Sequence, residues 1–379
     1  MLAQRMIFHF PSEASLNRTS GSSIRPQRML QAFRDIGYEV CDVSGNSRER
    51  ARAMITAYAW IDSANPPKFV YSESANFPTG LTDSDHLPRH PFMDFGLLRY
   101  AHQRGIPVGL FYRDMYWRFP VYRSQVAAWK RAITIPLFKH DLREYARELD
   151  VLFVPSMTFA ELLPSQLRST VTVCPLPPGG ALKTAHTAAK MNGPLQCLYV
   201  GNVSPPEHDI SSLLQAAQTL EDESVHITVC CPHESWLAAQ SHYAETSGGA
   251  ISFNVTIVHR KVLELDELYA AADVFLMPLP DAYARLAQPL KMFDAITHGL
   301  PIIVADDGQS AAGSLVTCDG LGIQVACSGV GIATALRHLM RDLERLSLLR
   351  LNVIRQAPMH TWDHRAEMAA DVLVRARAQ

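Results

Sequence analysis

The stretch that decides the fold covers residues 287–304 and reads AQPLKMFDAITHGLPIIV. Its proline, Pro289, fits the first turn of a helix, where a missing N–H removes no hydrogen bond. Apolar residues then recur at three- and four-residue steps until Gly299 and Pro301, which end the helix. The apolar run 300–304 follows at once and predicts a buried parallel strand. The stretch therefore predicts the helix and strand of an α/β domain.

Two polar side chains stand out in the predicted helix. Lys291 and Asp294 are three residues apart, so they share a face in its first turn. The backbone N–H groups of that turn favour an anion, and a phosphate could sit there with Lys291 beside it. Asp294 would accept hydrogen bonds from the hydroxyl groups of a sugar. The alternative is a solvated lysine and an aspartate that complements the helix dipole.

The composition indicates a protein of two domains. The chain has 379 residues, of which 47% are hydrophobic, and this is too long for one ordinary core. A net charge of −2 argues against general nucleic-acid binding, which usually shows a basic excess. Seven cysteines follow no zinc-binding or disulfide spacing, so they indicate buried thiols in a reducing compartment. With no signal peptide and no run of 18 apolar residues, we expect a cytoplasmic protein.

Alternating strands and helices predict two doubly wound α/β domains. The first series opens with the strand 6–10, the helix 25–36 and the strand 38–43, and the second series includes a long helix over 330–346. A tract of prolines, glycines and small residues separates the two series. We expect an N-terminal domain over 1–175, a linker over 176–193, a C-terminal domain over 194–360 and a helix over 361–379 that packs back on the first domain.

A short loop and a charged pair in the first domain lie beyond the carboxyl ends of predicted strands, where ligands of such sheets bind. The loop 20–23 holds Gly21, which permits close backbone approach, and Ser22, whose hydroxyl can donate. Arg113 and Asp114 directly follow a predicted strand. A flexible connection and a surface ion pair are the alternatives. The absence of a Gly-x-Gly-x-x-Gly pattern argues against a nicotinamide or flavin site.

A long polar loop, 72–90, is predicted later in the same domain, and loops of this length are often functional. It contains Glu73, a candidate general base. His86 and His90 are potential metal ligands, but no third ligand accompanies them at a suitable spacing. We therefore expect no metal site.

Residues 116–143 interleave basic side chains with Trp, Tyr and Phe, and Pro120 and Pro136 are expected to break them into short helical pieces. This composition is typical of a surface that lies on anionic lipid headgroups. It would also suit nucleic acid, but the near-neutral chain argues against that partner. A packed helix with a solvated basic face is the alternative. The first interpretation predicts a peripheral protein at the inner face of the membrane.

Two such domains in tandem resemble the GT-B fold of nucleotide-sugar glycosyltransferases, in which two Rossmann-like domains face each other across a cleft. The stretch 289–304 is similar to the donor-binding signature of the family-4-like, or group 1, enzymes: Pro-x-Lys, an acidic residue, a helix, Gly-x-Pro and a strand. The segments 24–30, 37–40, 199–203 and 268–278 are similar to further parts of the family, in the same order along the chain. The resemblance thus spans nearly the whole chain.

The resemblance implies a donor site for a nucleotide diphosphate sugar, and we expect UDP rather than GDP. Lys291 would contact the diphosphate and Asp294 the ribose. The donor-binding residues that it implies are Lys291, Asp294, Pro289, Leu290, Gly201, Asn202, Arg260, Val262, Gly21 and Ser22. The catalytic candidates are Asp114, Arg113 and Glu73. The sequence departs from the family where Asp294 and Leu286 replace two glutamates. It also departs after the first strand of the C-terminal domain, where Asn202 and Glu207–His208 stand in place of the common Arg and Lys.

The expected reaction is transfer of a hexose to a hydroxyl acceptor in polysaccharide or glycoconjugate synthesis, and a lipid-linked acceptor is one option. We expect retention of configuration and no cofactor or metal, because Lys291 and a helix N-terminus would stabilise the leaving diphosphate. Inversion would need a carboxylate base, for which Asp114 or Glu73 is the candidate. Two alternatives stay open. One is an epimerase of the same fold, and the other is a non-catalytic module that serves as an assembly partner.

Overall fold

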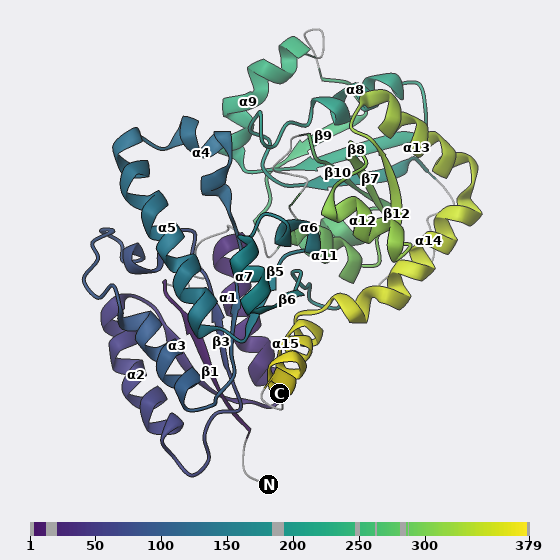
Figure 1. Cartoon of the computed structure of the whole chain (residues 1–379). Helices are drawn as coiled ribbons and strands as arrows, with labels where there is room; N and C mark the ends of the chain where they lie inside the picture. The colour runs from purple at the N-terminus through teal and green to yellow at the C-terminus, as the bar shows by residue number, and fades with distance from the viewer. Residues whose placement is uncertain are drawn as a thin grey trace. The chain divides into compact units, whose positions relative to one another are not determined.

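The structure is a computed structural model of the chain (Figure 1). It describes residues 4–12, 21–183, 193–246, 251–261, 264–280, 286 and 288–376, with the backbone alone for 21–23. The chain divides into two compact units, residues 1–177 with 362–379 and residues 178–361. Within the described residues, each unit contains a six-stranded sheet whose neighbouring strands are all parallel. Both units are therefore α/β, as predicted.

The sheet of the first unit has the strand order β2-β1-β3-β4-β5-β6. Its strands are β1 (Arg5–Phe10), β2 (Glu39–Ser44), β3 (Val70–Glu73), β4 (Val108–Phe111), β5 (Val151–Val154) and β6 (Thr172–Pro175). Its α-helices are α1 (Gly21–Asp35), α2 (Ser47–Ile61), α3 (Met93–Gln103), α4 (Pro120–Gln125), α5 (Ala128–Glu148), α6 (Met157–Ala160), α7 (Ser165–Thr170) and α15 (Trp362–Ala376), with 3-10 turns η1 (Thr79–Leu81) and η2 (Tyr116–Arg118). The order reverses between β1 and β3, which is the point where such sheets bind ligands.

Helices cover both faces of this sheet. Ile7 of β1 belongs to a core that includes buried residues of α2, α3 and α5. On the other face Phe8 contacts Tyr71, and α15 packs beside α1. Gly109 of β4 makes this packing possible, since a Cβ there would lie 2.6 Å from the Leu373 side chain of α15.

The sheet of the second unit has the order β12-β11-β10-β7-β8-β9. Its strands are β7 (Leu195–Val200), β8 (Val225–Cys230), β9 (Val255–Val258), β10 (Val274–Pro278), β11 (Ile302–Asp306) and β12 (Gly322–Ala326). Its helices are α8 (Ser211–Thr219), α9 (His233–Thr246), α10 (Leu265–Ala271), α11 (Leu290–Thr297), α12 (Ala311–Cys318), α13 (Gly329–Arg341) and α14 (Leu343–Gln356), followed by the 3-10 turn η5 (Ala357–His360). Here the order reverses between β7 and β10.

The helix and strand predicted from residues 287–304 are confirmed as α11 and β11. Phe293 and Ile296 are fully buried in a core that α11 shares with α10 and α12. Gly299 ends the helix at a φ of 77°, a left-handed conformation that favours glycine.

The two places where the chain passes between the units are joined to each other within the second unit. Gly180 pairs with Thr361 in a parallel β-bridge, and its N–H donates to the carbonyl oxygen of His360 over 2.9 Å. A Cβ at Gly180 would lie 2.4 Å from Thr297 Oγ1 and 2.6 Å from the carbonyl oxygen of Phe293, both on α11. Only glycine therefore fits between these backbones.

The prediction that Pro136 breaks its segment is wrong. Helix α5 runs through Pro136, and only the short α4, which starts at Pro120, matches the expected pieces. Phe138, Leu142 and Tyr145 are buried along α5 against the first unit. Their packing outweighs the cost of a proline inside a helix, about 3 kcal/mol.

Three further expectations differ from the structure. Residues 21–23 form the first turn of α1 rather than a loop. The helix expected over 330–346 is two helices, because Asp342 interrupts it and its side chain accepts a hydrogen bond from the Arg345 N–H over 2.8 Å. Helix α12 and strand β12 were not predicted, since one contains Gly313 among small residues and the other contains Gln324.

Candidate functional site

The second unit offers a ligand site where its strand order reverses. β7 and β10 are neighbours in the sheet, and the chain continues from them toward opposite edges. Parallel strands end at the same edge, so the turn after β7 and the start of α11 after β10 both belong to the carboxyl edge. This edge holds most of the donor residues predicted in the second unit.

The N-terminus of α11 carries the lysine and aspartate singled out above. Pro289 is the N-cap, with φ −61° and ψ 139°, and no side chain caps the helix there. The first N–H groups of α11 can therefore receive an anion. Lys291 Nζ lies 3.8 Å from Asp294 Oδ2, and the two side chains are 24% and 28% exposed. They lie on one face of the helix within reach of solvent.

Cys230, at the end of β8, places Lys291 near a second cation. Burial raises the pKa of the Cys230 thiol, whereas a backbone hydrogen bond from Arg260 and the charges of Lys291 and Arg260 act in the opposite direction. The charges of both side chains therefore act on one thiol. Arg260 follows β9, the strand beside β8, and Val262 lies outside the described residues.

The turn after β7 is held by its own hydrogen bonds. The Gly201 N–H donates to the Cys230 carbonyl oxygen over 3.0 Å, and the Tyr199 hydroxyl donates to the Asn202 carbonyl oxygen over 2.5 Å. A Cβ at Gly201 would lie 2.8 Å from that hydroxyl, which explains the glycine without a ligand. Asn202 Oδ1 accepts hydrogen bonds from the Val203 N–H over 2.8 Å and from the Ser204 hydroxyl over 3.0 Å. These hydrogen bonds hold the turn in place at the same edge of the sheet as the start of α11.

The first unit gathers a buried ionic cluster at the carboxyl ends of β3 and β4. Glu73 is 0% exposed, and Arg113 Nη2 donates to its Oε2 over 3.1 Å. Arg25 Nε lies 3.2 Å from Glu73 Oε1, which also accepts a hydrogen bond from the Tyr71 hydroxyl over 3.0 Å. Burial lowers the pKa of Arg113 and Glu73 acts against this. Both oxygens of Glu73 are therefore engaged, and sequence reasoning missed Arg25 because α1 brings it to β3 from far along the chain.

The other candidates of the first unit have simpler surroundings. Asp114 is partly exposed, and its Oδ1 accepts a hydrogen bond from the Tyr116 N–H over 2.7 Å. Gly21 and Ser22 stand in the first turn of α1, whose backbone alone is described there. Asp114 is thus the predicted carboxylate that stays accessible in this unit.

A fully buried network that the sequence did not reveal crosses the first unit below this cluster. His9 Nδ1 lies 2.8 Å from Ser72 Oγ, and His9 Nε2 lies 2.9 Å from Asp94 Oδ1. Arg50 donates to both oxygens of Asp94, over 2.8 Å and 3.0 Å. Burial acts to raise the pKa of Asp94, but His9 and Arg50 hold it below its ordinary value. The only signal in the sequence was a histidine inside an apolar strand.

A second buried acid lies near this network. The Thr79 N–H donates to Asp141 Oδ2 over 2.8 Å, and Thr79 Oγ1 lies 3.1 Å from the Tyr145 hydroxyl. Burial raises the pKa of Asp141 to about 7, with Thr79 acting against the rise and Asp94 adding to it. Asp141 therefore changes its charge near neutral pH.

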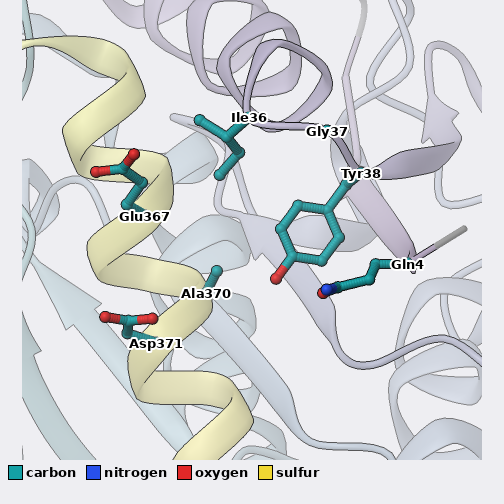
Figure 2. A pocket seen from close by; sticks show the side chains of 7 residues that line it. All are labelled: Gln4, Ile36, Gly37, Tyr38, Glu367, Ala370 and Asp371. Atoms are coloured by element: carbon teal, nitrogen blue, oxygen red, sulfur yellow. The ribbon is translucent and has the colours of Figure 1, made fainter. Parts of the chain in front are cut away.

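A separate pocket opens at the opposite edge of the first sheet. Its lining includes Gln4 before β1 and Tyr38 before β2, so it lies at the amino ends of the strands. Figure 2 shows Glu367, Ala370 and Asp371 of α15 along its other side. This pocket is therefore not part of the carboxyl edge of the sheet, where the candidate residues lie.

The described part of the chain shows neither a metal-binding cluster nor a membrane-spanning helix. No group of three or more His, Cys, Asp or Glu residues there has the geometry of a metal site. His86 Nδ1 lies 3.0 Å from the carbonyl oxygen of Leu81. None of the described helices has the length and apolar character needed to span a membrane.

Residues 194–342 match the family model described as Glycosyl transferases group 1. This match covers most of the second unit. Among curated proteins, no sequence matches the chain significantly.

Solved structures show that the fold of the whole chain is GT-B. Sucrose-phosphate synthase from Thermosynechococcus elongatus superposes with a TM-score of 0.63 at 13% identity, over 97% of this chain and 98% of that one. HepE from Anabaena, solved with UDP and glucose, gives 0.59 at 11% identity, over 98% and 99%. UGT2 from Phytolacca americana, solved with UDP-2-fluoro-glucose and pterostilbene, gives 0.50 at 10% identity, over 100% of both chains. Both units are thus parts of the same GT-B fold.

Proposed function

We propose that the protein transfers a sugar from a UDP-linked donor to a hydroxyl acceptor. The observation that carries this proposal is Lys291 at the uncapped start of α11, with Arg260 after β9 at the same edge of the sheet. Two cations and a helix N-terminus suit a diphosphate, which carries negative charge on several oxygens. The group 1 match covers this helix, and two proteins of the same fold are solved with UDP or a UDP-sugar.

We assign the donor contacts along this edge. Lys291 and the N–H groups after Pro289 hold the diphosphate, and Asp294, one helical turn along the same face, accepts hydrogen bonds from the ribose. Arg260 and the residues after β9 lie on the side of the base. Leu290 and the turn at Gly201 and Asn202 form the walls, because both adjoin the same strand ends.

The chemical step breaks the bond between the anomeric carbon and a diphosphate oxygen. Negative charge grows on that oxygen, and Lys291 with the helix N-terminus stabilises it. We propose retention, in which the leaving phosphate takes the proton of the acceptor hydroxyl. Glu73 is unsuited as a base because both its oxygens are engaged, so inversion would use Asp114 instead. NMR of the first-formed product distinguishes the two, since only retention gives the anomer of the donor.

The donor assignment is tested with Lys291→Ala. Losing one well-placed electrostatic contact raises a barrier by about 3–4 kcal/mol, so turnover is expected to fall at least about a hundredfold. Lys68→Ala, which removes an exposed lysine of the first unit, is the matched control and keeps its turnover. Near-normal turnover in Lys291→Ala, with folding intact, would contradict the assignment.

The two alternatives differ in what they do with a donor. An epimerase converts labelled UDP-sugar without an acceptor, whereas a transferase needs the acceptor for transfer. A non-catalytic module binds neither UDP nor GDP in calorimetry. We expect UDP to bind and GDP to bind more weakly, and the absence of binding by both would remove the transferase proposal.

We also propose that α4 and α5 rest on an anionic membrane, where a lipid-linked acceptor would lie. Trp129 and Ile133, one turn apart on α5, are 65% and 52% exposed. Arg123, Lys130 and Lys139 are exposed in the same segment, and no Asp or Glu occurs between residues 116 and 140. Exposed apolar groups among cations suit an anionic headgroup surface. The protein would then be peripheral at the inner face of the membrane.

Cosedimentation with vesicles tests this surface. Vesicles that contain phosphatidylglycerol are expected to retain the protein, and purely zwitterionic vesicles to release it. Ile133→Ser should weaken retention, whereas Ile55→Ser should not, because Ile55 is 72% exposed on α2 outside the basic segment. Equal recovery with both kinds of vesicle would overturn the proposal.

A further inference from the structure

The ionic cluster of the first unit leaves part of one arginine unsatisfied. Arg25 is 5% exposed, and its Nε and Nη1 atoms are buried without a hydrogen-bond partner. Its Nε still lies 3.2 Å from Glu73 Oε1, so the charge is balanced in part, but Nη1 has no acceptor. A buried donor without an acceptor costs about 1–3 kcal/mol, so such a donor calls for a partner, and a bound ion is one that can supply the acceptor.

The guanidinium group of Arg25 is held in a fixed orientation. Its central carbon lies 3.5 Å from the centre of the Phe111 ring and 5.9 Å from that of the Trp362 ring. Tyr71, whose hydroxyl lies 3.5 Å from Arg25 Nη2, approaches from the side of Glu73. The planar group therefore needs little reordering to bind a ligand.

The charges around this site favour an anion. Two guanidinium groups share the single buried carboxylate of Glu73, and they repel each other. Asp114 also attracts Arg113, but it is partly exposed and its Oδ1 holds the Tyr116 N–H. Among the described residues, Glu73 is the carboxylate that pairs with Arg25. An oxyanion fits such a guanidinium better than a neutral group, because its hydrogen bonds are charge-assisted.

We propose that the first unit binds an oxyanion, phosphate or carboxylate, on Arg25 at the carboxyl edge of its sheet. This inference rests on the proposed function. Because the donor is assigned to the edge of the second sheet, we assign the anion at Arg25 to the acceptor. The acceptor is then an acid-bearing molecule, and its charged group positions the hydroxyl that receives the sugar. The planar fork of Arg25 supplies the selectivity for an oxyanion.

The test uses the full chain with Lys291→Ala as background, which removes the donor-site lysine as a second anion site. Sodium phosphate and sodium acetate are compared with sodium chloride at equal ionic strength by thermal shift, and affinity is measured by calorimetry. Phosphate or acetate is expected to raise Tm beyond chloride, by mass action. The anion with the higher affinity in calorimetry identifies the acid, because phosphate also raises Tm by exclusion from the protein surface. No rise with either anion overturns the proposal.

Arg25→Gln in the same background should weaken the affinity at least about tenfold, since one charge-assisted hydrogen bond contributes about 1.5–3 kcal/mol. Arg28→Gln is the matched control, because Arg28 is an exposed arginine of the same helix. If Arg25→Gln does not fold, Arg25→Lys keeps the charge and removes the planar fork, and it should also weaken binding. Unchanged affinity in the folded Arg25 variant overturns the assignment.

The two proposals fail in different ways. With Lys291 intact, Arg25→Gln is expected to bind UDP as tightly as the unaltered protein, because the donor contacts assigned above to Lys291, Asp294 and Arg260 lie in the other unit. If the unaltered protein does not bind UDP, this result contradicts the proposed function alone. Loss of anion binding with UDP binding intact contradicts this inference alone.

Discussion

Asp141 gives the sharpest prediction of how stability depends on pH. Its carboxyl group is buried, and its pKa is about 7 in the folded protein against an ordinary value of 3.8. Between these values the unfolded chain releases a proton that the folded chain keeps. The contribution of Asp141 to the free energy of unfolding is therefore largest below pH 3.8, falls as pH rises, and levels off above about pH 7.

The size of this loss of stability follows from the difference between the folded and the ordinary pKa of Asp141. Each pH unit contributes about 1.4 kcal/mol while only the folded state holds the proton. Over roughly three units the loss amounts to about 4 kcal/mol at pH 8. Asp141→Asn removes the titration and keeps an oxygen that accepts the Thr79 N–H. We expect this variant to be more stable than the unaltered protein at pH 8 and to show a flatter dependence.

The assay is urea unfolding followed between pH 4.5 and pH 8 and compared between variants. Glu161→Gln, at an exposed acid of the same unit, is the control and should keep the pH dependence of the unaltered protein. An Asp141→Asn profile parallel to that of the unaltered protein would refute the reasoning. It would mean that water or a neighbour already solvates the ionised carboxylate.

Three further predictions concern packing and reactivity. Gly109→Val should destabilise the first unit by about 1–3 kcal/mol, because its Cβ would lie 2.6 Å from Leu373; an unchanged urea midpoint would contradict this. His9→Leu should cost about 1–3 kcal/mol in the same assay, since it removes a hydrogen bond to the buried Asp94, and a stabilised variant would show that the network is dispensable. Iodoacetamide at neutral pH should label the exposed Cys318 first, because burial raises the pKa of Cys41 to about 11; mass spectrometry that finds Cys41 modified first would contradict the packing of β2.

The sequence predicted the fold well where local patterns and tertiary packing agree. The strands predicted over 6–10, 38–43 and 300–304 are found as β1, β2 and β11 within two residues of those bounds, because each is an apolar or alternating run beside clear turn signals. Pro136 shows the limit of such reasoning. Its local preference opposes a helix, and only the buried side chains of α5, packed on distant residues, reverse the outcome.

The site was predictable to the extent that it is local. Lys291 and Asp294 lie within one helical turn, so their spacing alone places them on one face. The contacts of Arg25 with Glu73 and of His9 with Asp94 join residues far apart in the chain. The spacing of residues along the sequence predicts contacts within one helix or strand only. The contacts of Arg25 and His9 join different elements, so they can be found only in the folded structure.

The bridge between Gly180 and Thr361 ties the two covalent connections between the units to each other inside the second unit. Gly180 also lies directly against α11, where a Cβ would meet Thr297 and the carbonyl oxygen of Phe293. A larger residue at position 180 would therefore push on the helix that carries Lys291. The absence of a side chain at one residue of the connection thus helps to fix the position of a helix in the candidate donor site.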